Sequence, residues 1–300
     1  AQERTKREFR GRRPLLLRLV RCQDVQLRDF SLRDSAAWTL NLFQCKNVRI
    51  DRLTINSRVA PNNDGIDVDS CENIRIADCD IDTGDDSICF KTTSAQTCRD
   101  ITVTGCRLKS RHGTIKFGTE SVGNFENITI TNCAIRETRG GGIKILSVDG
   151  ANIRNIRISD ITMEDVVTPI FVRLGARLKT YRPGETARPV GSIEDVVIRN
   201  VRAVSAKQGP PMPPSGIFIT GIPGHRVGNI SITLPGGGTR EHGRAGLAEN
   251  IAIYPELNRF GPTLPAYGLY ARHAQDLTVK NLKLELTAPD LRPVIVCQDG

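Results

Sequence analysis

Short segments in which apolar and polar residues alternate run through the whole chain, and turn-forming residues separate them. Three consecutive stretches align without gaps: NIRIADCDIDTGDDSICFK at 73–91, DITVTGCRLKSRHGTIKFG at 100–118 and NITITNCAIRETRGGGIKI at 127–145. In each, Ile, Val, Leu or Cys recurs at every second position of short runs that Asp, Asn, Gly and Ser interrupt. This alternation predicts short β-strands, and no stretch shows the period of a helix.

A four-residue phrase, Cys-x-Asn/Asp-Val/Ile, recurs along the chain. It begins at Cys22, Cys45, Cys71 and Cys98, at spacings of 23, 26 and 27 residues, and continues without Cys as FENI, IRNI, IEDV, VGNI and AQDL. A unit made only of short strands cannot bury its own apolar face, so it must stack on copies of itself. We therefore expect an all-β fold, a single-stranded parallel β-helix (solenoid) with coils of about 23–28 residues, spaced about 4.8 Å apart.

The repeat makes residues 1–300 one solenoid domain. Leucine-rich repeats would show their own asparagine-leucine signature, and propeller blades would be longer. Stretches rich in Pro and Gly near residues 175–190, 205–225 and 233–247 are expected to be loops that leave the solenoid, not linkers between domains.

The cysteines follow the same repeat. Cys79, Cys106 and Cys133 are each 27 residues apart, which predicts one inward ladder. Small apolar filler is the expected role of these thiols, and the odd total of nine cysteines also argues against complete disulfide pairing. No Cys-x-x-Cys pair or Cys/His zinc spacing is present, so we expect no metal site and no cofactor.

Alignment of the units on the isoleucine that ends each turn gathers the acidic residues. Asp64 and Asp86 both stand two residues before that isoleucine, so they become neighbours one coil apart, with Asp85 beside them and His112 on the next coil. The outward position after the isoleucine forms a second column, of Asp67, Cys89, Lys116, Lys144 and Phe171. Two residues further along stand Lys91 and Arg173.

Clustered carboxylates beside lysines stabilise a fold poorly, because like charges on adjacent coils repel. They suit the hydrolysis of a glycosidic bond in an acidic polysaccharide. Crowding raises the proton affinity of one Asp, which can then act as an acid, while another Asp activates water. The alternative is that these Asp residues only form turns at the coil corners.

The net charge of +9, with a pI near 9.3, favours an anionic partner. Nucleic acid is not expected, because no interleaved aromatic residues or nucleic-acid motif accompany the charge. No apolar run approaches the roughly twenty residues of a membrane span, so no membrane partner is expected. The basic first twenty residues lack the small-residue cleavage site of a signal peptide.

Four motifs in this order resemble those of the polygalacturonase family of glycoside hydrolases, which are right-handed parallel β-helices that act on pectin. The family carries Asn-Thr-Asp, Gly-Asp-Asp, Gly-His-Gly and Arg-Ile-Lys on successive coils. This chain has NND at 62–64, GDD at 84–86, RHG at 111–113 and GIK at 142–144. The resemblance extends from about Arg13 to the end, and IKFGTES and LPAYGLYARH look closer to the bacterial branch.

The resemblance implies an inverting hydrolase of α-glycosidic bonds in galacturonate-containing polysaccharide. Asp85 would be the general acid, Asp64 and Asp86 the pair that activates water, and His112 a support for their protonation state. Expected substrate contacts are Asn62, Lys116, Lys144 and Arg173. The resemblance further implies a monomer, secreted or periplasmic, in a chain that lacks the family's N-terminal coils and cap and ends early.

The chain departs from the family at Asn63, Arg111 and Gly142. Gly142 replaces an Arg and so removes a bidentate carboxylate clamp. We expect Lys144, helped by Lys116 or Arg173, to grip a uronate carboxylate instead, with less directionality. The alternatives are a β-helix that binds acidic glycans without cleaving them, a rhamnogalacturonan hydrolase, and a pectate lyase.

Overall fold

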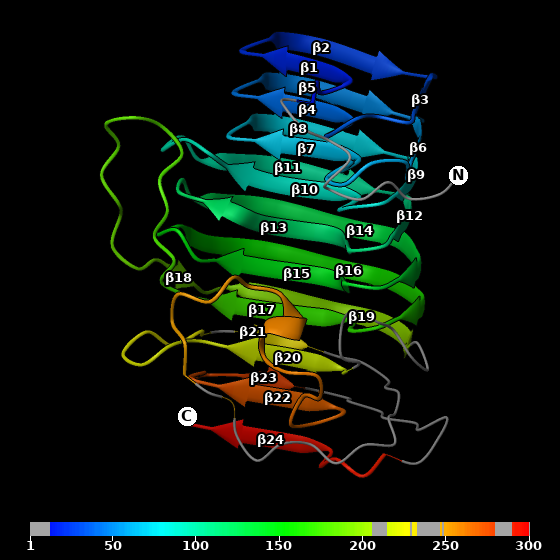
Figure 1. Ribbon diagram of the computed structural model, residues 1–300. Helices are drawn as coiled ribbons and strands as arrows, with labels where there is room; N and C mark the ends of the chain where they lie inside the picture. The colour runs from blue at the N-terminus through cyan, green and yellow to red at the C-terminus, as the bar shows by residue number, and fades with distance from the viewer. Residues whose placement is uncertain are drawn as a thin grey trace.

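The computed structural model describes residues 13–205, 215–228, 230–232, 247, 249–279 and 290–299. This part of the chain winds into a parallel β-helix whose coils stack from the N-terminal to the C-terminal end (Figure 1), which confirms the expected fold class. One face is a ten-stranded parallel sheet formed by β1 (Leu17–Val20), β4 (Leu40–Phe43), β7 (Ile66–Asp69), β10 (Ile88–Thr92), β13 (Gly113–Ser121), β15 (Gly141–Ser147), β17 (Ile170–Leu174), β20 (Ile217–Thr220), β22 (Leu269–Arg272) and β24 (Ile295–Gln298).

The other faces form a second parallel sheet, because the long strands β14 and β16 turn a corner without a break. Its strands are β2 (Gln23–Arg28), β3 (Ser31–Arg33), β5 (Lys46–Asp51), β6 (Thr54–Ser57), β8 (Glu72–Ala77), β9 (Asp80–Thr83), β11 (Cys98–Thr104), β12 (Arg107–Ser110), β14 (Phe125–Thr138), β16 (Asn152–Val166), β18 (Ser192–Ile193), β19 (Val196–Ser205), β21 (Ile230–Ile232) and β23 (Thr278–Val279). One short 3₁₀ helix, η2 (Leu257–Arg259), is described outside the coils.

Stacked aliphatic side chains fill the solenoid. In the second sheet, like residues meet at like positions in a ladder of Ile50, Ile76, Val103, Ile130, Ile158 and Ile198, all essentially without solvent exposure. Each such side chain stabilises the fold by roughly 1.5–3 kcal/mol through burial. The alternation in the sequence therefore becomes a continuous core, and no single coil could form it alone.

The Asn or Asp of the recurring phrase has a backbone role. Asp24, Asn47, Asn73, Asp100 and Asn127 all have φ between 55° and 59°, the left-handed region that Asn and Asp tolerate better than most residues. Their side chains form ladders along the stack, since Asn47 Nδ2 donates to Asp24 Oδ1 at 2.9 Å and Asn73 Nδ2 to Asn47 Oδ1 at 2.8 Å. The phrase thus marks a coil corner that turns through a left-handed residue.

The predicted cysteine ladder is confirmed. Cys79, Cys106 and Cys133 are 1–2% exposed and lie on consecutive coils, where each thiol donates to the backbone carbonyl oxygen two residues before it. All nine cysteines are free thiols, and the buried ones act as apolar filler and not as cross-links.

Two segments project from the coils. The expected loop near 175–190 is confirmed between β17 and β18, and the segment 249–268, which carries η2, packs against the ten-stranded sheet (Figure 1). A second apolar cluster, made by Leu146, Val167, Phe171, Phe218, Leu257, Leu264, Ala266 and Tyr270, fixes this segment.

None of the described helices is long and apolar enough to cross a membrane.

The prediction of a second loop, near residues 205–225, is wrong in part. The buried strand β20 (Ile217–Thr220) lies within 205–225, because its four residues continue the stacking of β17 onto β22, and residues 206–214 lie outside the described residues. The third expected loop, 233–247, lies outside the described residues except for residue 247.

Candidate active site

The predicted columns form on the ten-stranded sheet. Register pairs Ile66 with Ile88, Ile88 with Ile115, Ile115 with Ile143, and Ile143 with Ile170. The next position aligns Asp67, Cys89, Lys116, Lys144 and Phe171, as the repeat indicated. The strand starts of β7, β10 and β13 therefore bring the predicted carboxylates onto neighbouring coils.

Asp86 lies at the centre of the cluster and is held as a carboxylate. Lys116 Nζ donates to Asp86 Oδ2 at 2.7 Å, and the backbone N–H of Gly113 donates to Oδ1 at 3.0 Å. Burial opposes ionisation of Asp86, but the charges of Lys116, Lys144 and Lys91 outweigh it and hold the pKa below its ordinary value. Gly113 permits this contact, because an added Cβ would lie 2.8 Å from Asp86 Oδ1.

Asp85 is adjacent in sequence, but its pKa is shifted in the opposite direction. Burial, followed by the negative charge of Asp86, raises the pKa of Asp85, and the charge of His112 only partly offsets this. Asn62 Nδ2 lies 3.4 Å from Asp85 Oδ2, and the Ser110 hydroxyl donates to the Asp85 carbonyl oxygen at 2.6 Å and accepts the His112 backbone N–H at 2.8 Å. The structure thus places Asn62, Asp85 and His112 together at the partly exposed edge of the cluster.

Asp64 shares the buried side of the cluster with Asp67. Lys91 Nζ lies 3.4 Å from an oxygen of each carboxylate and 3.2 Å from Glu120 Oε2, and it stands 4.5 Å from the centre of the Trp38 ring. Burial raises the pKa of Asp64, with the neighbouring Asp67 as the next cause, and burial also raises the pKa of Asp67 to about 7. One lysine is therefore shared by three carboxyl groups, and two of them favour the protonated form.

Lys116 and Lys144 lie outside the solenoid core, as expected, but they do not face solvent. Lys116 is 5% exposed and Lys144 is fully buried. Lys144 Nζ donates to both carboxylate oxygens of Glu256, at 2.7 and 2.6 Å, and Glu256 also lies 3.8 Å from Lys116 Nζ. The position expected to hold a uronate carboxylate is therefore occupied by a carboxylate of the protein itself.

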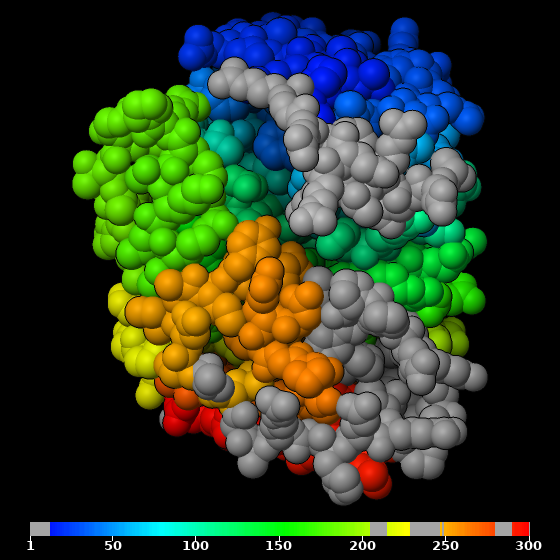
Figure 2. Space-filling view, viewed as in Figure 1, coloured from blue at the N-terminus to red at the C-terminus, as the bar shows by residue number. Residues whose placement is uncertain are grey.

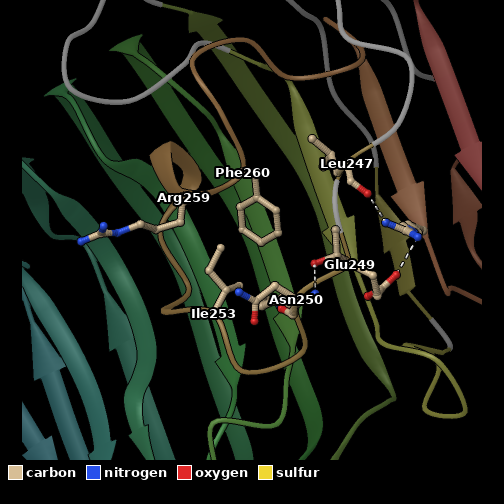
Figure 3. A pocket seen from close by; sticks show the side chains of 9 residues that line it. Leu247, Glu249, Asn250, Ile253, Arg259 and Phe260 are labelled. Atoms are coloured by element: carbon tan, nitrogen blue, oxygen red, sulfur yellow. Dashed lines mark hydrogen bonds and ion pairs between the residues drawn. The ribbon is translucent and has the colours of Figure 1, made fainter.

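Arg173 lies apart from this group. Register places it beside Leu146 and Thr220, where its guanidinium donates to Thr220 Oγ1 and to the carbonyl oxygens of Gly221 and Asn250. It stacks near Phe260 and lines a separate cavity of about 230 Å³ (Figure 3), into which Phe260 points while the Arg259 side chain turns away. In these contacts Arg173 holds the 249–268 segment against the coils, and the structure does not bring it to the acidic cluster.

The same cluster offers a set of possible cation ligands. Among the described residues, oxygens of Asp64 and Asp86 and the Cys89 sulfur lie within 4.8 Å of one another. Lys91 and Lys116 already contact these carboxylates, and burial raises the pKa of the Cys89 thiol well above its usual range. Ammonium groups and a protonated thiol fit a metal ion poorly, so this donor set is better suited to proton chemistry.

Sequence reasoning missed Glu120 and Glu256. Glu120 belongs to the stretch IKFGTES. Burial opposes ionisation of the Glu120 carboxyl group, but the charges of Lys91 and Lys116 lower its pKa to about 2. Glu256 lies 112 residues from Lys144, in a segment outside the repeat, so no periodic signal could have revealed it. In Figure 2 the loop between β17 and β18 (green, left) and the 249–268 segment (orange, below) border a recess floored by the earlier coils.

Comparison with known proteins identifies the family of the chain. The model of Glycosyl hydrolases family 28 matches residues 2–211. A probable polygalacturonase of Vitis vinifera is 40% identical over 81 residues, which cover 27% of this chain and 16% of that protein. A polygalacturonase of Persea americana is 24% identical over 196 residues, or 65% of this chain and 42% of that protein. The chain thus spans less than half the length of these relatives.

Solved structures share the fold. An exopolygalacturonase from Thermotoga maritima superposes with a TM-score of 0.68 at 22% identity, covering 91% of this chain and 55% of that one. A family 28 exopolygalacturonase from Yersinia enterocolitica gives 0.64 at 16% identity, covering 96% of this chain and 47% of that one. The fold is the right-handed parallel β-helix, and the chain belongs to glycosyl hydrolase family 28.

Proposed function

We propose that this chain carries the active site of an inverting glycoside hydrolase that cleaves pectic, galacturonate-containing polysaccharide. The observation that carries the proposal is the pair Asp85 and Asp86, neighbours in sequence whose environments drive their pKa values in opposite directions. A pair of carboxyl groups separated in this way provides an acid and a base at the same pH.

The acid is Asp85. Its raised pKa favours the protonated form that a general acid needs, and its partly exposed position lets it reach the leaving glycosidic oxygen. His112, on the next coil, is one of the groups that limit how far this pKa rises. Asn62, 3.4 Å from Asp85 Oδ2, orients the carboxyl group.

The base is Asp86, and Asp64, whose raised pKa favours the protonated form, helps to position the water that Asp86 activates. Asp86 remains ionised through Lys116 and the Gly113 N–H, so it can accept a proton from a water molecule that attacks the sugar. Asp64 shares the site, with a carboxylate oxygen within 4.8 Å of one of Asp86. Attack by water on the face opposite the leaving group would invert the anomeric carbon.

The proposal includes an acidic pectic polymer as partner, a monomeric enzyme, and a site of action outside the cytoplasm. The names of the relatives support the substrate class, and the net charge of +9 agrees with a polyanion.

Release of reducing ends tests the proposal on polygalacturonate and rhamnogalacturonan in parallel. Asp85→Asn should lower kcat by about 10²-fold or more, because the amide keeps the volume but has no proton to donate. Asp80→Asn is the matched control, since Asp80 is a half-exposed Asp of the same coil, paired with Arg107. Nuclear magnetic resonance of the first products should show the inverted anomer. An Asp85→Asn enzyme within threefold of wild type would reject the assignment.

A further inference from the structure

We propose that Glu256 determines the specificity of this site, by making the sugar position beside Lys116 and Lys144 accept a residue without a carboxylate. This inference rests on the proposed function, because it concerns the polymer that the same site takes. Its basis is the pairing of charges in the cluster.

Each buried lysine of the cluster has its own carboxylate. Lys91 contacts Glu120 at 3.2 Å, Lys116 contacts Asp86 at 2.7 Å, and Lys144 contacts Glu256 at 2.6 Å. Asp64 and Asp67 add further acidic groups around Lys91. Within this cluster, no lysine is left to pair with a uronate carboxylate of a substrate.

The surface that a sugar meets at this point belongs to Glu256. The Lys144 side chain has no exposed area, whereas that of Glu256 is 11% exposed. A uronate placed there would bring a second carboxylate against the first, and the two would repel. A sugar hydroxyl would instead donate a hydrogen bond to the Glu256 carboxylate.

Glu256 is built into its position. Its backbone N–H donates to the Tyr254 carbonyl oxygen at 2.8 Å, and its carbonyl oxygen accepts the Arg259 N–H at 2.9 Å. The next residue, Leu257, is fully buried in the second apolar cluster, and the Tyr254 hydroxyl lies 3.2 Å from Thr119 Oγ1 on β13. A substrate carboxylate would have to displace an anchored group to reach Lys144.

Gly142 supports the same conclusion independently. A Cβ added there would lie 2.7 Å from Met163 Sδ and 2.9 Å from the Pro169 carbonyl oxygen. Backbone closes this position to any larger side chain, so the arginine of the family motif has no room. Both cationic contacts of that motif are therefore lost. The arginine has no room at Gly142, and the charge of Lys144 is neutralised by Glu256.

The test compares wild type with Glu256→Gln, which keeps the shape of the side chain and releases Lys144 from its counter-charge. Glu249→Gln is the matched control, because Glu249 lies in the same segment and pairs with Arg272 at 2.6 Å, away from the acidic cluster. Calorimetry measures the Kd for trigalacturonate, and release of reducing ends gives kcat/KM on polygalacturonate and on rhamnogalacturonan, in which a neutral sugar alternates with the uronate.

Glu256→Gln should tighten trigalacturonate binding at least about tenfold, the scale of one charge-assisted hydrogen bond. The gain should fall with added salt and should appear in kcat/KM on polygalacturonate but not on rhamnogalacturonan. Glu249→Gln should behave as wild type. A Kd within twofold of wild type, or an equal change in the control, would overturn the proposal.

A second variant covers the case in which Glu256→Gln does not fold because Lys144 is left buried without a partner. Lys144→Met/Glu256→Gln removes both charges. Because Glu256 is the exposed member of the pair, loss of its repulsion should outweigh loss of the Lys144 attraction, so this variant should bind trigalacturonate more tightly than wild type, and an unchanged Kd would overturn the inference. Binding is read independently of turnover. A wild type that cleaves neither polymer would therefore reject the proposed function while the Kd values still decide the role of Glu256.

Discussion

Replacement of Lys116 by Met should be among the most damaging single changes in the cluster. The side chains of Lys116 and Asp86 are 6% and 2% exposed and joined at 2.7 Å, so the variant leaves a buried carboxylate without its closest counter-charge. Removing one partner of a buried ion pair costs about 3–5 kcal/mol of stability. Asp86 keeps the Gly113 N–H and the more distant charge of Lys144, so we expect about 3 kcal/mol for Lys116→Met at pH 7.

The double variant Lys116→Met/Asp86→Asn shows whether the ion pair is the cause. The amide that replaces the Asp86 carboxylate would be neutral and could still accept the Gly113 N–H, so most of the lost stability should return. The coupling energy of the cycle should be at least about 2 kcal/mol. Lys46→Met is the matched control, because Lys46 pairs with Glu72 at 3.1 Å on the surface, and loss of such a pair costs less than about 1 kcal/mol.

The pH dependence of this effect has a definite sign. In wild type the pKa of Asp86 is depressed, so this group stabilises the fold above the unfolded value, about 3.9, and loses its contribution as pH falls through the depressed value. Without Lys116 the pKa of Asp86 rises, so the penalty of Lys116→Met should be full at pH 7, shrink as pH falls, and become small only below the depressed pKa of wild-type Asp86. Urea unfolding, followed by circular dichroism and by the fluorescence of the single Trp38, measures these differences. A cost no larger than that of Lys46→Met, or additive single effects, would refute the reasoning.

Three further predictions follow from the site and the core. Because the pKa of Asp85 is raised, kcat should fall as pH rises through that pKa. This alkaline fall in kcat should be absent from the residual activity of Asp85→Asn. An Asp85→Asn enzyme with the same dependence of kcat on pH as wild type would exclude Asp85 as the acid. Asp67 has a pKa of about 7 in the fold, so its ionisation lowers the stability of the fold as pH rises from about 4 to 7. Asp67→Asn should therefore unfold at a higher urea concentration than wild type at pH 8 but not at pH 4. Equal shifts of the urea midpoint at both pH values would contradict the assignment. Since all nine cysteines are free, dithiothreitol should leave Tm unchanged, and iodoacetamide should label the exposed Cys297 first. A thiol that iodoacetamide does not label after denaturation would show a disulfide and contradict this prediction.

The repeat made the coils and most of the acidic cluster predictable. A solenoid converts equal positions in successive units into spatial neighbours, so the spacing of Ile66, Ile88 and Ile115 was enough to bring Asp64 beside Asp86. The outward column was predictable for the same reason. The burial of Lys144 was not predictable, because the segment that covers this residue is not part of any repeat unit.

Two errors share that cause. Arg173 was expected beside Lys144, but apolar packing of Phe171 and Phe218 with the 249–268 segment gives its guanidinium other partners. The strand β20 was read as loop, because the Pro-rich residues before it concealed a buried run of four. In both places the deciding contacts join residues far apart in sequence, which periodicity does not record.

The contact between Lys144 and Glu256 also has a consequence for the order in which the site is completed during synthesis. The cluster of Asp64, Asp86 and Lys116 needs only neighbouring coils, since Asp86 and Lys116 are 30 residues apart, and coils can stack as they emerge. Glu256 follows Lys144 by 112 residues, a delay of roughly 6–22 s at 5–20 residues per second. For that interval the nascent chain holds the acid and the base beside a lysine that has not yet met its counter-charge.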